Sequence, residues 1–345
     1  MQNTVMPDCV ESAPALALSW QAQLERLPGI LPLDKSTLSF LPRMLSRYTS
    51  PDPYMVCPSY HAFTGRYGLW AYYKERSLLL LARNPANSDE ILIFPQLGEQ
   101  VPNLALDIIE NIDMPAGGYR LARYPAEQAE FTAAILNKRA SNFAFDVITE
   151  DILDWTYPVH VIETGKIVNP AGRKMKSFRQ HLSDIDQSRI TVKPFHSESD
   201  IPELMGIVDK WAKSKEGSVD YDEMIEVYSG LFDLVLHPAL NLRGIKIYYD
   251  GELKAYEIWD MPKDKGGMAN SFAGFSDAEI SGFSEFQHYA LCKALSEAGI
   301  ERVCLGGSEA EGLDRFKRKM NPVQSVELKS IIVRSASSKR SVVAQ

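Results

Sequence analysis

Apolar and polar residues follow two regular patterns along the chain. The first begins with residues 14–28, where Leu16, Trp20, Leu24 and Leu27 recur at the spacing of one helix face. Residues 30–66 follow, rich in Pro, Ser and aromatic residues, and we predict no regular element there. Beyond them we predict strands over 67–73, 77–83, 90–94, 119–124 and 143–148, and helices over 103–111 and 126–138.

The second pattern starts near residue 189 and contains more helix. A turn signal, Asp250-Gly251, joins two strands into a hairpin, and Gly299 marks the end of a long helix. In chain order we predict strand 189–195, helices 199–215 and 222–236, hairpin strands 244–249 and 253–260, strand 269–275, helix 285–298, strand 302–305, helix 312–319 and strand 326–333.

This order of elements predicts an α/β fold in which mixed sheets are flanked by helices. The second half has the element order of a GNAT acyltransferase domain, and the layout of the first half suggests a degenerate copy, although no sequence repeat is visible. We therefore predict an N-terminal GNAT-like domain with a helical segment over residues 1–185. A C-terminal GNAT-like domain carrying the site is expected over 186–334, and a disordered tail over 335–345.

Composition limits the possible functions. Of the 345 residues, 45% are hydrophobic and 24% are charged, as in soluble globular proteins, and the net charge is −8. This charge argues against nonspecific coating of nucleic acid but allows a local basic groove. The N-terminus lacks the basic region of a signal peptide, and no apolar run is long enough to span a bilayer. We expect a soluble, cytoplasmic protein.

The cysteines give no sign of a metal or disulfide framework. Cys9, Cys57, Cys292 and Cys304 are far apart, without a CxxC pair or the Cys/His spacing of zinc ligands. We expect reduced thiols and no metal site.

A glycine pair near the C-terminus has the features of a binding site. Gly306 and Gly307 end a short apolar run, and a helix carrying several basic residues follows. Glycines at a strand end let another group approach the backbone closely, and a helix N-terminus offers N–H donors. Ser308 can cap this helix, contact a substrate, or do both. The candidate substrate-binding residues here are Gly306, Gly307, Ser308, Arg315 and Lys317.

Three segments of the chain resemble a known family. They are residues 154–158 (DWTYP) with 164–166 (TGK) and 173–178 (RKMKSF), residues 251–256 (GELKAY), and residues 305–308 (LGGS) with 312–317 (GLDRFK) and 321–322 (NP). Together they are similar to the C-terminal domain family of phosphatidylglycerol lysyltransferases, which is close to the Fem-type aminoacyltransferases. The resemblance implies tandem GNAT-like folds, an aminoacyl-tRNA donor and no cofactor.

Two departures from the family change the expected acceptor. Lipid-modifying relatives carry an N-terminal membrane domain, whereas nothing in this sequence can span a bilayer, and many of them are basic, whereas this chain is acidic. We therefore expect an acyltransferase that forms an amide or ester on a small-molecule or peptide acceptor rather than on a lipid. The oligomeric state is left open.

Two alternatives keep the same fold. One is an N-acyltransferase that uses acyl-CoA or an acyl carrier protein, and the other is a ligand-binding module without catalysis. GNAT enzymes that use acetyl-CoA carry a compact glycine-rich loop for the pyrophosphate. Residues 274–285 occupy the corresponding place, but their glycines, Gly274 and Gly282, are widely spaced among acids that would repel a pyrophosphate.

Acyl transfer to an amine requires a base and a stabilised oxyanion. Candidate catalytic residues are Glu257, Asp277, Glu285 and His288, with Asp260 as a further acid. Glu285 and His288 are three positions apart on a predicted helix and can share a face, although a packed or surface role also suits this histidine. Asn270 and Ser271 are candidates for binding a substrate amide. No Ser-His-Asp arrangement is recognisable, so no covalent enzyme intermediate is predicted.

A basic run precedes the second pattern. Its candidate contacts to tRNA or other phosphates are Lys166, Arg173, Lys174 and Lys176. The alternative is a solvated helix face. A second basic set, over residues 315–319, supports phosphate binding only if both sets face one groove.

Overall fold

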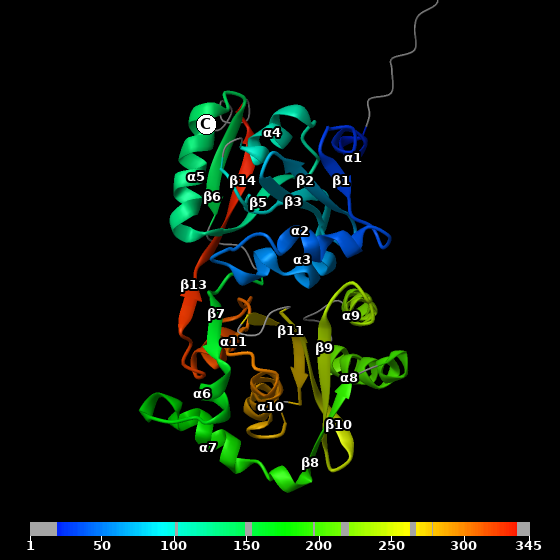
Figure 1. Cartoon of the computed structure of the whole chain (residues 1–345), viewed down its shortest axis with the longest axis vertical. Coiled ribbons are helices and arrows are strands. Elements are labelled where there is room, and N and C mark those ends of the chain that lie inside the picture. Colours follow the sequence, from blue (N-terminus) through cyan, green and yellow to red (C-terminus); the bar gives the residue numbers. More distant parts are fainter. Residues whose placement is uncertain are drawn as a thin grey trace, which may run out of the picture.

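Two seven-stranded sheets form the framework of the molecule (Figure 1). The structure is a computed structural model, and it describes residues 19–100, 103–148, 154–195, 197–214, 221–262, 267–277 and 279–336.

The first sheet has the order β1-β2-β3-β4-β5-β14-β6, and its only parallel pair among the described strands is β4 with β5. Its strands are β1 (Ile30–Pro32), β2 (Leu69–Lys74), β3 (Ser77–Asn84), β4 (Asn87–Ile93), β5 (Gly118–Pro125), β14 (Leu328–Ser335) and β6 (Phe143–Ile148). Around it lie α1 (Trp20–Leu24), α2 (Leu41–Leu45), α3 (Pro58–Thr64), α4 (Leu104–Asn111) and α5 (Ala126–Arg139).

The second sheet has the order β13-β7-β12-β11-β10-β9-β8, with β11 and β12 parallel. Its strands are β13 (Gln324–Val326), β7 (Val159–Glu163), β12 (Arg302–Cys304), β11 (Met268–Ser276), β10 (Glu252–Asp260), β9 (Leu242–Tyr249) and β8 (Ile190–Phe195). Its helices are α6 (Thr164–Val168), α7 (Lys176–Asp184), α8 (Ile201–Ser214), α9 (Tyr221–Val235), α10 (Phe283–Glu297) and α11 (Glu311–Arg318).

The sheets divide the chain differently from the expected boundary at residue 185. Strand β7 precedes that boundary but lies in the second sheet, between β12 and β13. Strand β14 follows the boundary but lies in the first sheet, between β5 and β6. Each of these two strands pairs with strands far away in sequence. The local sequence pattern therefore does not reveal that β7 and β14 lie in the sheet of the other half of the chain. Strand β14 includes Ser335, which the predicted tail contained, and residues 337–345 lie outside the described residues.

Several local expectations also change. The helix predicted over 14–28 is Trp20–Leu24 within the described residues, and the segment 30–66 contains β1, α2 and α3 as well as turns of 3-10 helix. The hairpin turn is confirmed, because Asp250 and Gly251 both have positive φ, 52° and 82°. Two positive φ angles match the right-handed twist of the strands that they join.

Helices cover both faces of the second sheet. α6, α7 and α10 pack on one face, with Phe178 and Leu291 in their core, and α8 and α9 pack on the other. The core on the α8–α9 side continues across to the first sheet through α2 and α3 (Figure 1). It includes Leu80 and Leu92 of the first sheet and Ile258 of the second. This shared core fixes the two sheets against each other and so defines the space between them.

Within the described part of the chain, none of the helices has both the length and the apolar character needed to cross a bilayer.

Candidate functional site

A cavity of about 1740 Å³ lies where the two sheets meet. α3 and the loops of the first sheet line one side, and β10, β11 and α8 to α11 line the other. Ligand pockets are commonly about 300–1,000 Å³. This cavity therefore has room for parts of two substrates at once.

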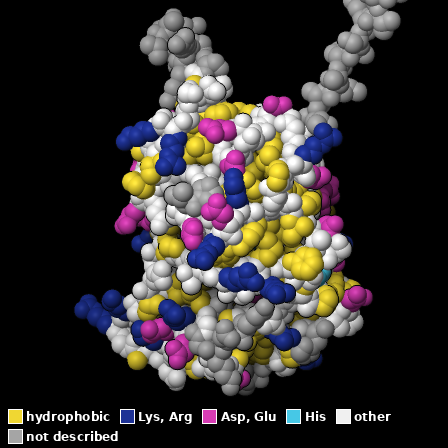
Figure 2. Space-filling model, turned by 45° about the horizontal axis from the view of Figure 1, so that its top comes forward, with side chains coloured by type: hydrophobic (Ala, Val, Ile, Leu, Met, Phe, Trp, Pro, Cys, Tyr) yellow, Lys and Arg dark blue, Asp and Glu magenta, His cyan; other side chains and the backbone are white. Residues whose placement is uncertain are grey.

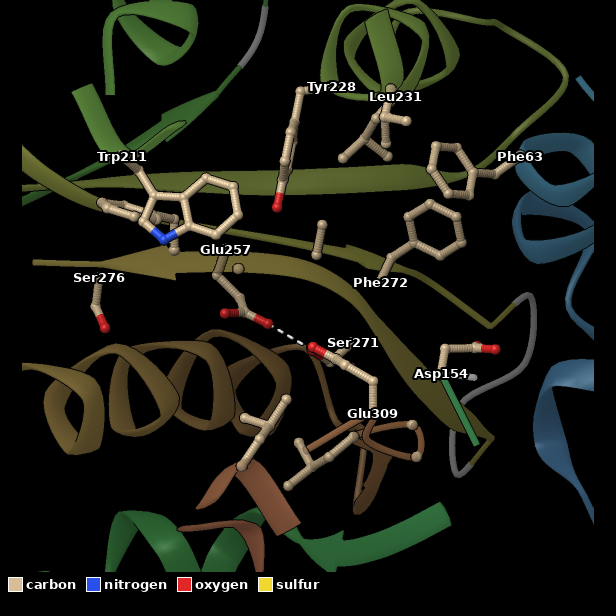
Figure 3. A pocket seen from close by; sticks show the side chains of 18 of the residues that line it. Phe63, Asp154, Trp211, Tyr228, Leu231, Glu257, Ser271, Phe272, Ser276 and Glu309 are labelled. Carbon is tan, nitrogen blue, oxygen red and sulfur yellow. Dashed lines mark hydrogen bonds between the residues drawn. The ribbon is translucent and has the colours of Figure 1, made fainter. Parts of the chain in front are cut away.

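Glu257 on β10 faces this cavity (Figure 3) and is only 1% exposed. Ser271 Oγ donates a hydrogen bond of 2.6 Å to its Oε1, and Gln287 Nε2 donates one of 2.5 Å to its Oε2. Burial raises the pKa of Glu257 to about 7, although these two hydrogen bonds and the charge of Lys317 act in the opposite direction. A carboxyl with this pKa can both accept and release a proton near neutral pH.

Gly274 leaves room for this carboxyl. It is paired with Glu257 in the β10–β11 register. A Cβ atom at Gly274 would lie 2.2 Å from Glu257 Oε2 and 2.3 Å from Gln287 Nε2. Any larger residue would displace the hydrogen-bonded pair.

Lys317 on α11 is a buried cation with a lowered pKa, as expected of a catalytic lysine. It lines the cavity and is 7% exposed. Its Nζ donates to the carbonyl of Gly307 and lies 3.5 Å from that of Gly306. Burial lowers the pKa of Lys317 to about 8, while the charges of Glu309, Asp154 and Glu257 oppose this shift. The ammonium group therefore remains mostly protonated at pH 7.

His288 on α10 also lines the cavity, as a neutral side chain. Its Nδ1 lies 2.9 Å from the carbonyl oxygen of Ser284, so this nitrogen carries the proton and Nε2 is an acceptor. Burial lowers the pKa of His288 to about 4, and its ring packs edge-on against Phe316 at 5.2 Å.

Gly306 and Gly307 allow other parts of the protein's own chain to pack closely against their backbone. A Cβ at Gly306, whose φ is 68°, would lie 2.8 Å from the hydroxyl of Tyr54, and one at Gly307 would lie 2.5 Å from the carbonyl oxygen of Asp154. Both glycines also line the cavity. Ser308 is fully buried, accepts a backbone hydrogen bond from Tyr157, and is not part of the cavity lining. The expectation that Ser308 caps the helix is wrong, because α11 begins at Glu311 with Ala310 at its N-cap.

The two acids predicted near α10, Asp277 and Glu285, lie in different places. Asp277 lines the cavity, and its Oδ2 lies 3.3 Å from Nζ of Lys254. Glu285 is buried elsewhere, with its Oε1 2.6 Å from His181 Nδ1 and 3.8 Å from Lys319 Nζ. The structure therefore does not bring Glu285 into the cavity with His288.

The neighbours Asn270 and Ser271 also point to different places. Ser271 lines the cavity and holds Glu257, as described above. The backbone N–H and Nδ2 of Asn270 donate to Asp260 Oδ1 at 2.7 and 3.1 Å, which joins β10 to β11 outside the cavity lining. Asp260 also accepts from Cys57 Sγ at 3.2 Å, and burial raises the pKa of this carboxyl.

The predicted phosphate contacts do not surround this cavity. The basic run over 166–176 is exposed on α6, α7 and the turn between them, and Lys166 pairs with Glu163. In the second set, Arg315 is exposed and pairs with Glu311 at 2.9 Å. Of the two sets, only Lys317 lines the cavity; the residues outside its lining are Lys166, Arg173, Lys174, Lys176, Arg315, Arg318 and Lys319. Figure 2 shows Lys and Arg side chains interspersed with acids on the face it presents, beside a broad hydrophobic area.

A buried arginine that the sequence analysis missed supports one wall of the cavity. Arg123 on β5 is fully buried, and its Nε donates to Asp52 Oδ2 at 2.7 Å while Nη1 donates to Asp154 Oδ2 at 3.0 Å. Its guanidinium lies 4.7 Å from the ring centroid of Tyr60 and 5.1 Å from that of Trp155. The strand 118–125 contains two arginines, at 120 and 123, and a cation in a strand that packs against the core was the available signal.

A Ser-His-Asp chain of contacts is also present, contrary to expectation. His160 on β7 lies 2.8 Å from Ser325 Oγ through Nδ1 and 2.7 Å from Asp314 Oδ1 through Nε2. Arg318 Nε donates to the other oxygen of Asp314 at 2.7 Å. These side chains are outside the cavity lining, and they attach α11 to β7 and β13. We interpret them as the anchor of the helix that carries Lys317.

Among the described residues, no group of three or more His, Cys, Asp or Glu side chains is arranged to hold a metal ion.

Residues 58–333 match the family described as phosphatidylglycerol lysyltransferase, C-terminal. The chain belongs to this family. It is thus a member of a transferase family, as the three resembling segments predicted. No curated protein matches the sequence.

Solved structures agree with the fold. A conserved protein of unknown function from Bacteroides thetaiotaomicron has a TM-score of 0.66 at 14% identity, covering 88% of this chain and 99% of its own. FemX has a TM-score of 0.59 at 11% identity, with coverages of 91% and 99%. The C-terminal domain of a putative lysylphosphatidylglycerol synthetase from Agrobacterium fabrum has a TM-score of 0.55 at 14% identity, with coverages of 90% and 96%. At these identities the likeness concerns the fold alone, and it confirms the predicted α/β architecture of two mixed sheets flanked by helices, shared with FemX.

Proposed function

We propose that this protein transfers an amino acid from aminoacyl-tRNA to an amino or hydroxyl group of a small-molecule or peptide acceptor. Membership of the lysyltransferase family and the likeness to FemX support a transferase of this kind. The observation that carries the proposal is the buried carboxyl of Glu257, with a pKa of about 7, in a cavity of about 1740 Å³ that also contains Lys317.

Glu257 would act as the base. The acceptor nitrogen or oxygen attacks the ester carbonyl of the aminoacyl group, and its proton passes to the Glu257 carboxylate. Ser271 and Gln287 hold that carboxylate in place with neutral hydrogen bonds, so it needs no reorganisation to accept the proton. His288 Nε2 is a second acceptor that could receive or relay this proton.

Lys317 would stabilise the charge that develops on oxygen. An ammonium group has three donors, and two carbonyls of the glycine pair face this one, which leaves a donor for a substrate oxygen. This donor first binds the oxyanion of the tetrahedral intermediate, and it then binds the ribose oxygen of the tRNA end as that oxygen leaves. When the intermediate collapses, the bond from carbon to this ribose oxygen breaks, and the oxygen takes the proton held by Glu257.

The surroundings of β11 favour an aminoacyl donor over acyl-CoA. The turn that would hold a pyrophosphate in an acetyl-CoA enzyme presents Asp277 and Glu279 to the cavity. Lys254 offsets part of the charge of Asp277, but Glu279 adds a second carboxylate at this position that repels a pyrophosphate group.

The proposal is tested by incubating the purified protein with aminoacyl-tRNA and a small-molecule fraction of cells. Mass spectrometry of the soluble products should then detect adducts that are heavier by one aminoacyl residue. Treatment of the tRNA with RNase beforehand should abolish them, and so should Glu257→Gln. Adducts that survive RNase treatment and instead require acyl-CoA would overturn the proposal.

A further inference from the structure

The second sheet opens in its middle, between β11 and β12. These strands are paired only over residues 268–270 and 302–304. Beyond this point β11 stays paired with β10 as far as Ser276, whereas the chain that follows β12 stays beside β7. There, Leu305 donates its backbone N–H to the carbonyl oxygen of His160. We call the resulting opening between residues 271–277 and 305–307 the fork.

The edge of β11 lines the cavity along this fork. All residues over 271–277 belong to the cavity lining, and so do residues 305–307 on the other side. Side chains of a strand alternate between the two faces of a sheet, so a consecutive run of lining residues means that the strand presents its edge. These residues are at least partly exposed, whereas residues 255–260 of the neighbouring β10 are buried.

The β10–β11 ladder determines which backbone groups point into the fork. Asp277 donates its backbone N–H to the carbonyl oxygen of Lys254, and hydrogen-bonded pairs alternate along an antiparallel ladder. Phe275 therefore turns its N–H and C=O toward β10, and Gly274 and Ser276 turn theirs toward the fork. Within the described part of the chain, neither residue has a backbone partner on that side.

An added strand would complete this edge. Backbone N–H and C=O groups inside a sheet are normally paired, and an open edge binds an extended chain through main-chain hydrogen bonds. In a parallel pairing one residue of that chain serves both free positions. Its N–H donates to the carbonyl oxygen of Gly274, and its C=O accepts from the N–H of Ser276. Because β12 is itself parallel to β11, such a chain continues the place that β12 leaves.

The reacting groups lie toward the closed end of the fork. A Cβ atom at Gly274 would clash with the carboxyl of Glu257, so this carboxyl is beside the first free residue of the edge. Across the fork, Nζ of Lys317 donates to the carbonyl oxygen of Gly307. One strand residue spans about 3.4 Å. A chain parallel to β11 with its second residue beside Phe275 therefore has its amino end next to Glu257.

We propose that the acceptor is a peptide with a free amino end, bound in extended form along the edge formed by Gly274 and Ser276. This inference names the acceptor class and rests on the proposed function. The amino nitrogen forms a bond to the ester carbon of the donor while its proton passes to Glu257. The bond from that carbon to the ribose oxygen then breaks, and the oxygen takes the proton. The aminoacyl end of tRNA carries no series of amides that matches this edge.

The arm of coenzyme A also contains amides, but the open end of the fork disfavours it. Pairing with β12 closes the fork at Asn270, so a long ligand leaves past Ser276. Asp277 and Glu279 line the cavity there. Lys254, 3.3 Å from Asp277, offsets part of this charge, but the second carboxylate still repels a pyrophosphate. A neutral or basic peptide meets no such repulsion.

Binding of tetra-alanine to the full chain tests the inference without a donor. In an isotope-labelled protein, the backbone amide signals of Gly274 and Ser276 should shift on titration. An analogue with an ester in place of its first amide lacks the N–H that bonds to Gly274, and Ser276→Pro removes the protein's own N–H. Each change should weaken binding about twofold to tenfold, the range for one hydrogen bond. Proline is tolerated where a strand's N–H faces away from its ladder.

Val192→Pro is the matched control. Val192 is 43% exposed on β8, the outer strand of the same sheet. Asp250 donates its backbone N–H to Arg189, so by the same alternation the N–H of Val192 faces away from β9. Pro194 already occupies the next outward position of this strand. The control variant should bind tetra-alanine as the wild type does.

The outcomes separate this inference from the proposed function. Equal binding of tetra-alanine and its ester analogue, or unchanged signals of Gly274 and Ser276, would overturn the inference and leave aminoacyl transfer to a non-peptide acceptor intact. Shifts of these signals by an acyl-CoA but not by the peptide would contradict both. If tetra-alanine binds but receives no amino acid from aminoacyl-tRNA, the peptide site stands and the proposed function is wrong.

Discussion

Two buried lysines of the second half of the chain show how the partners of a charge decide its role. Lys246 and Lys317 are each 7% exposed. Burial alone would lower the pKa of both, but Nζ of Lys246 lies 2.6 Å from Asp200 and 2.8 Å from Glu203, and these hydrogen bonds raise its pKa well above the ordinary value. Lys317 faces neutral carbonyls instead, and its pKa falls to about 8.

The difference separates a structural charge from a reactive one. Lys246 joins β9 to the start of α8, and its carboxylate partners neutralise it. In the cavity, Lys317 and Glu257 are both held by neutral groups. Burial therefore shifts the pKa of each toward physiological pH without a charged partner that reverses the shift. The predictions below test this contrast, from the largest expected effect to the smallest.

Glu257→Gln should reduce the rate of transfer by about 100-fold to 10,000-fold, because it removes the base while preserving the shape of the side chain. Single-turnover transfer from labelled aminoacyl-tRNA measures this rate. The matched control is Glu203→Gln in the Lys246 region, which should leave the rate within about twofold. Equal rates in the two variants would break the contrast between the regions.

Lys317→Met should lower the transfer rate by about 100-fold to 1,000-fold, the usual loss when one donor to an oxyanion is removed. Lys246→Met should instead lower the free energy of unfolding by about 1–3 kcal/mol, since it leaves two carboxylates without their cation. Urea unfolding measured alongside transfer distinguishes the two effects. A Lys317→Met variant that transfers at the normal rate would rule out the role given to this residue.

The pH dependence of transfer should follow the two cavity groups. Glu257 must be ionised to accept a proton, so the rate rises with pH up to its pKa of about 7. Lys317 must be protonated to donate, so the rate falls above its pKa of about 8. Each limb should change the rate by about tenfold per pH unit. Lys246 should make no contribution, because its pKa is raised far above this range.

The two variants show which group causes each limb of the pH–rate profile. Residual activity of Glu257→Gln should lack the acid limb, and that of Lys317→Met should lack the alkaline limb. Stability provides a second readout, because the folded pKa of Lys317, about 8, is below the unfolded value of 10.5. The unfolded chain then binds the proton more tightly, so the free energy of unfolding should rise with pH between these values. Lys317→Met should remove that rise.

Gly274→Ala should have the smallest effect on transfer, a loss of about 10-fold to 100-fold, because the added methyl group moves Glu257 without removing it. The overpacking should also cost about 1–3 kcal/mol of stability. Gly206→Ala in α8 is the control, because a Cβ there meets no atom within 4 Å. This control should be neutral or slightly stabilising in thermal unfolding. Normal transfer by Gly274→Ala would show that the position of the carboxyl matters little.

Much of the local structure could be predicted from the sequence. The Asp250-Gly251 turn needs residues that tolerate positive φ, and such residues are recognisable at once. Glu257, His288 and Lys317 were named as candidates from residue type and from the family resemblance, and all three line the cavity.

Features that depend on distant pairing could not be predicted. The exchange of β7 and β14 between the sheets arises from pairs far apart in sequence. His160 is 165 positions from Ser325 and 154 from Asp314, so no spacing rule connects these residues. Glu285 and His288 are close on one helix, yet an angular difference around the helix axis places only His288 on the cavity. Burial selects among candidates of the same chemical type, and sequence spacing alone does not determine burial.

The central claim is that Glu257 and Lys317 act together in tRNA-dependent aminoacyl transfer. The most direct measurement follows labelled amino acid from tRNA to a soluble product in a single turnover, with the wild type, Glu257→Gln and Lys317→Met compared side by side. We predict that the wild type moves the label, that RNase treatment prevents this, and that both variants leave the label on tRNA. Equal transfer by all three proteins, or transfer that is insensitive to RNase, would contradict the account.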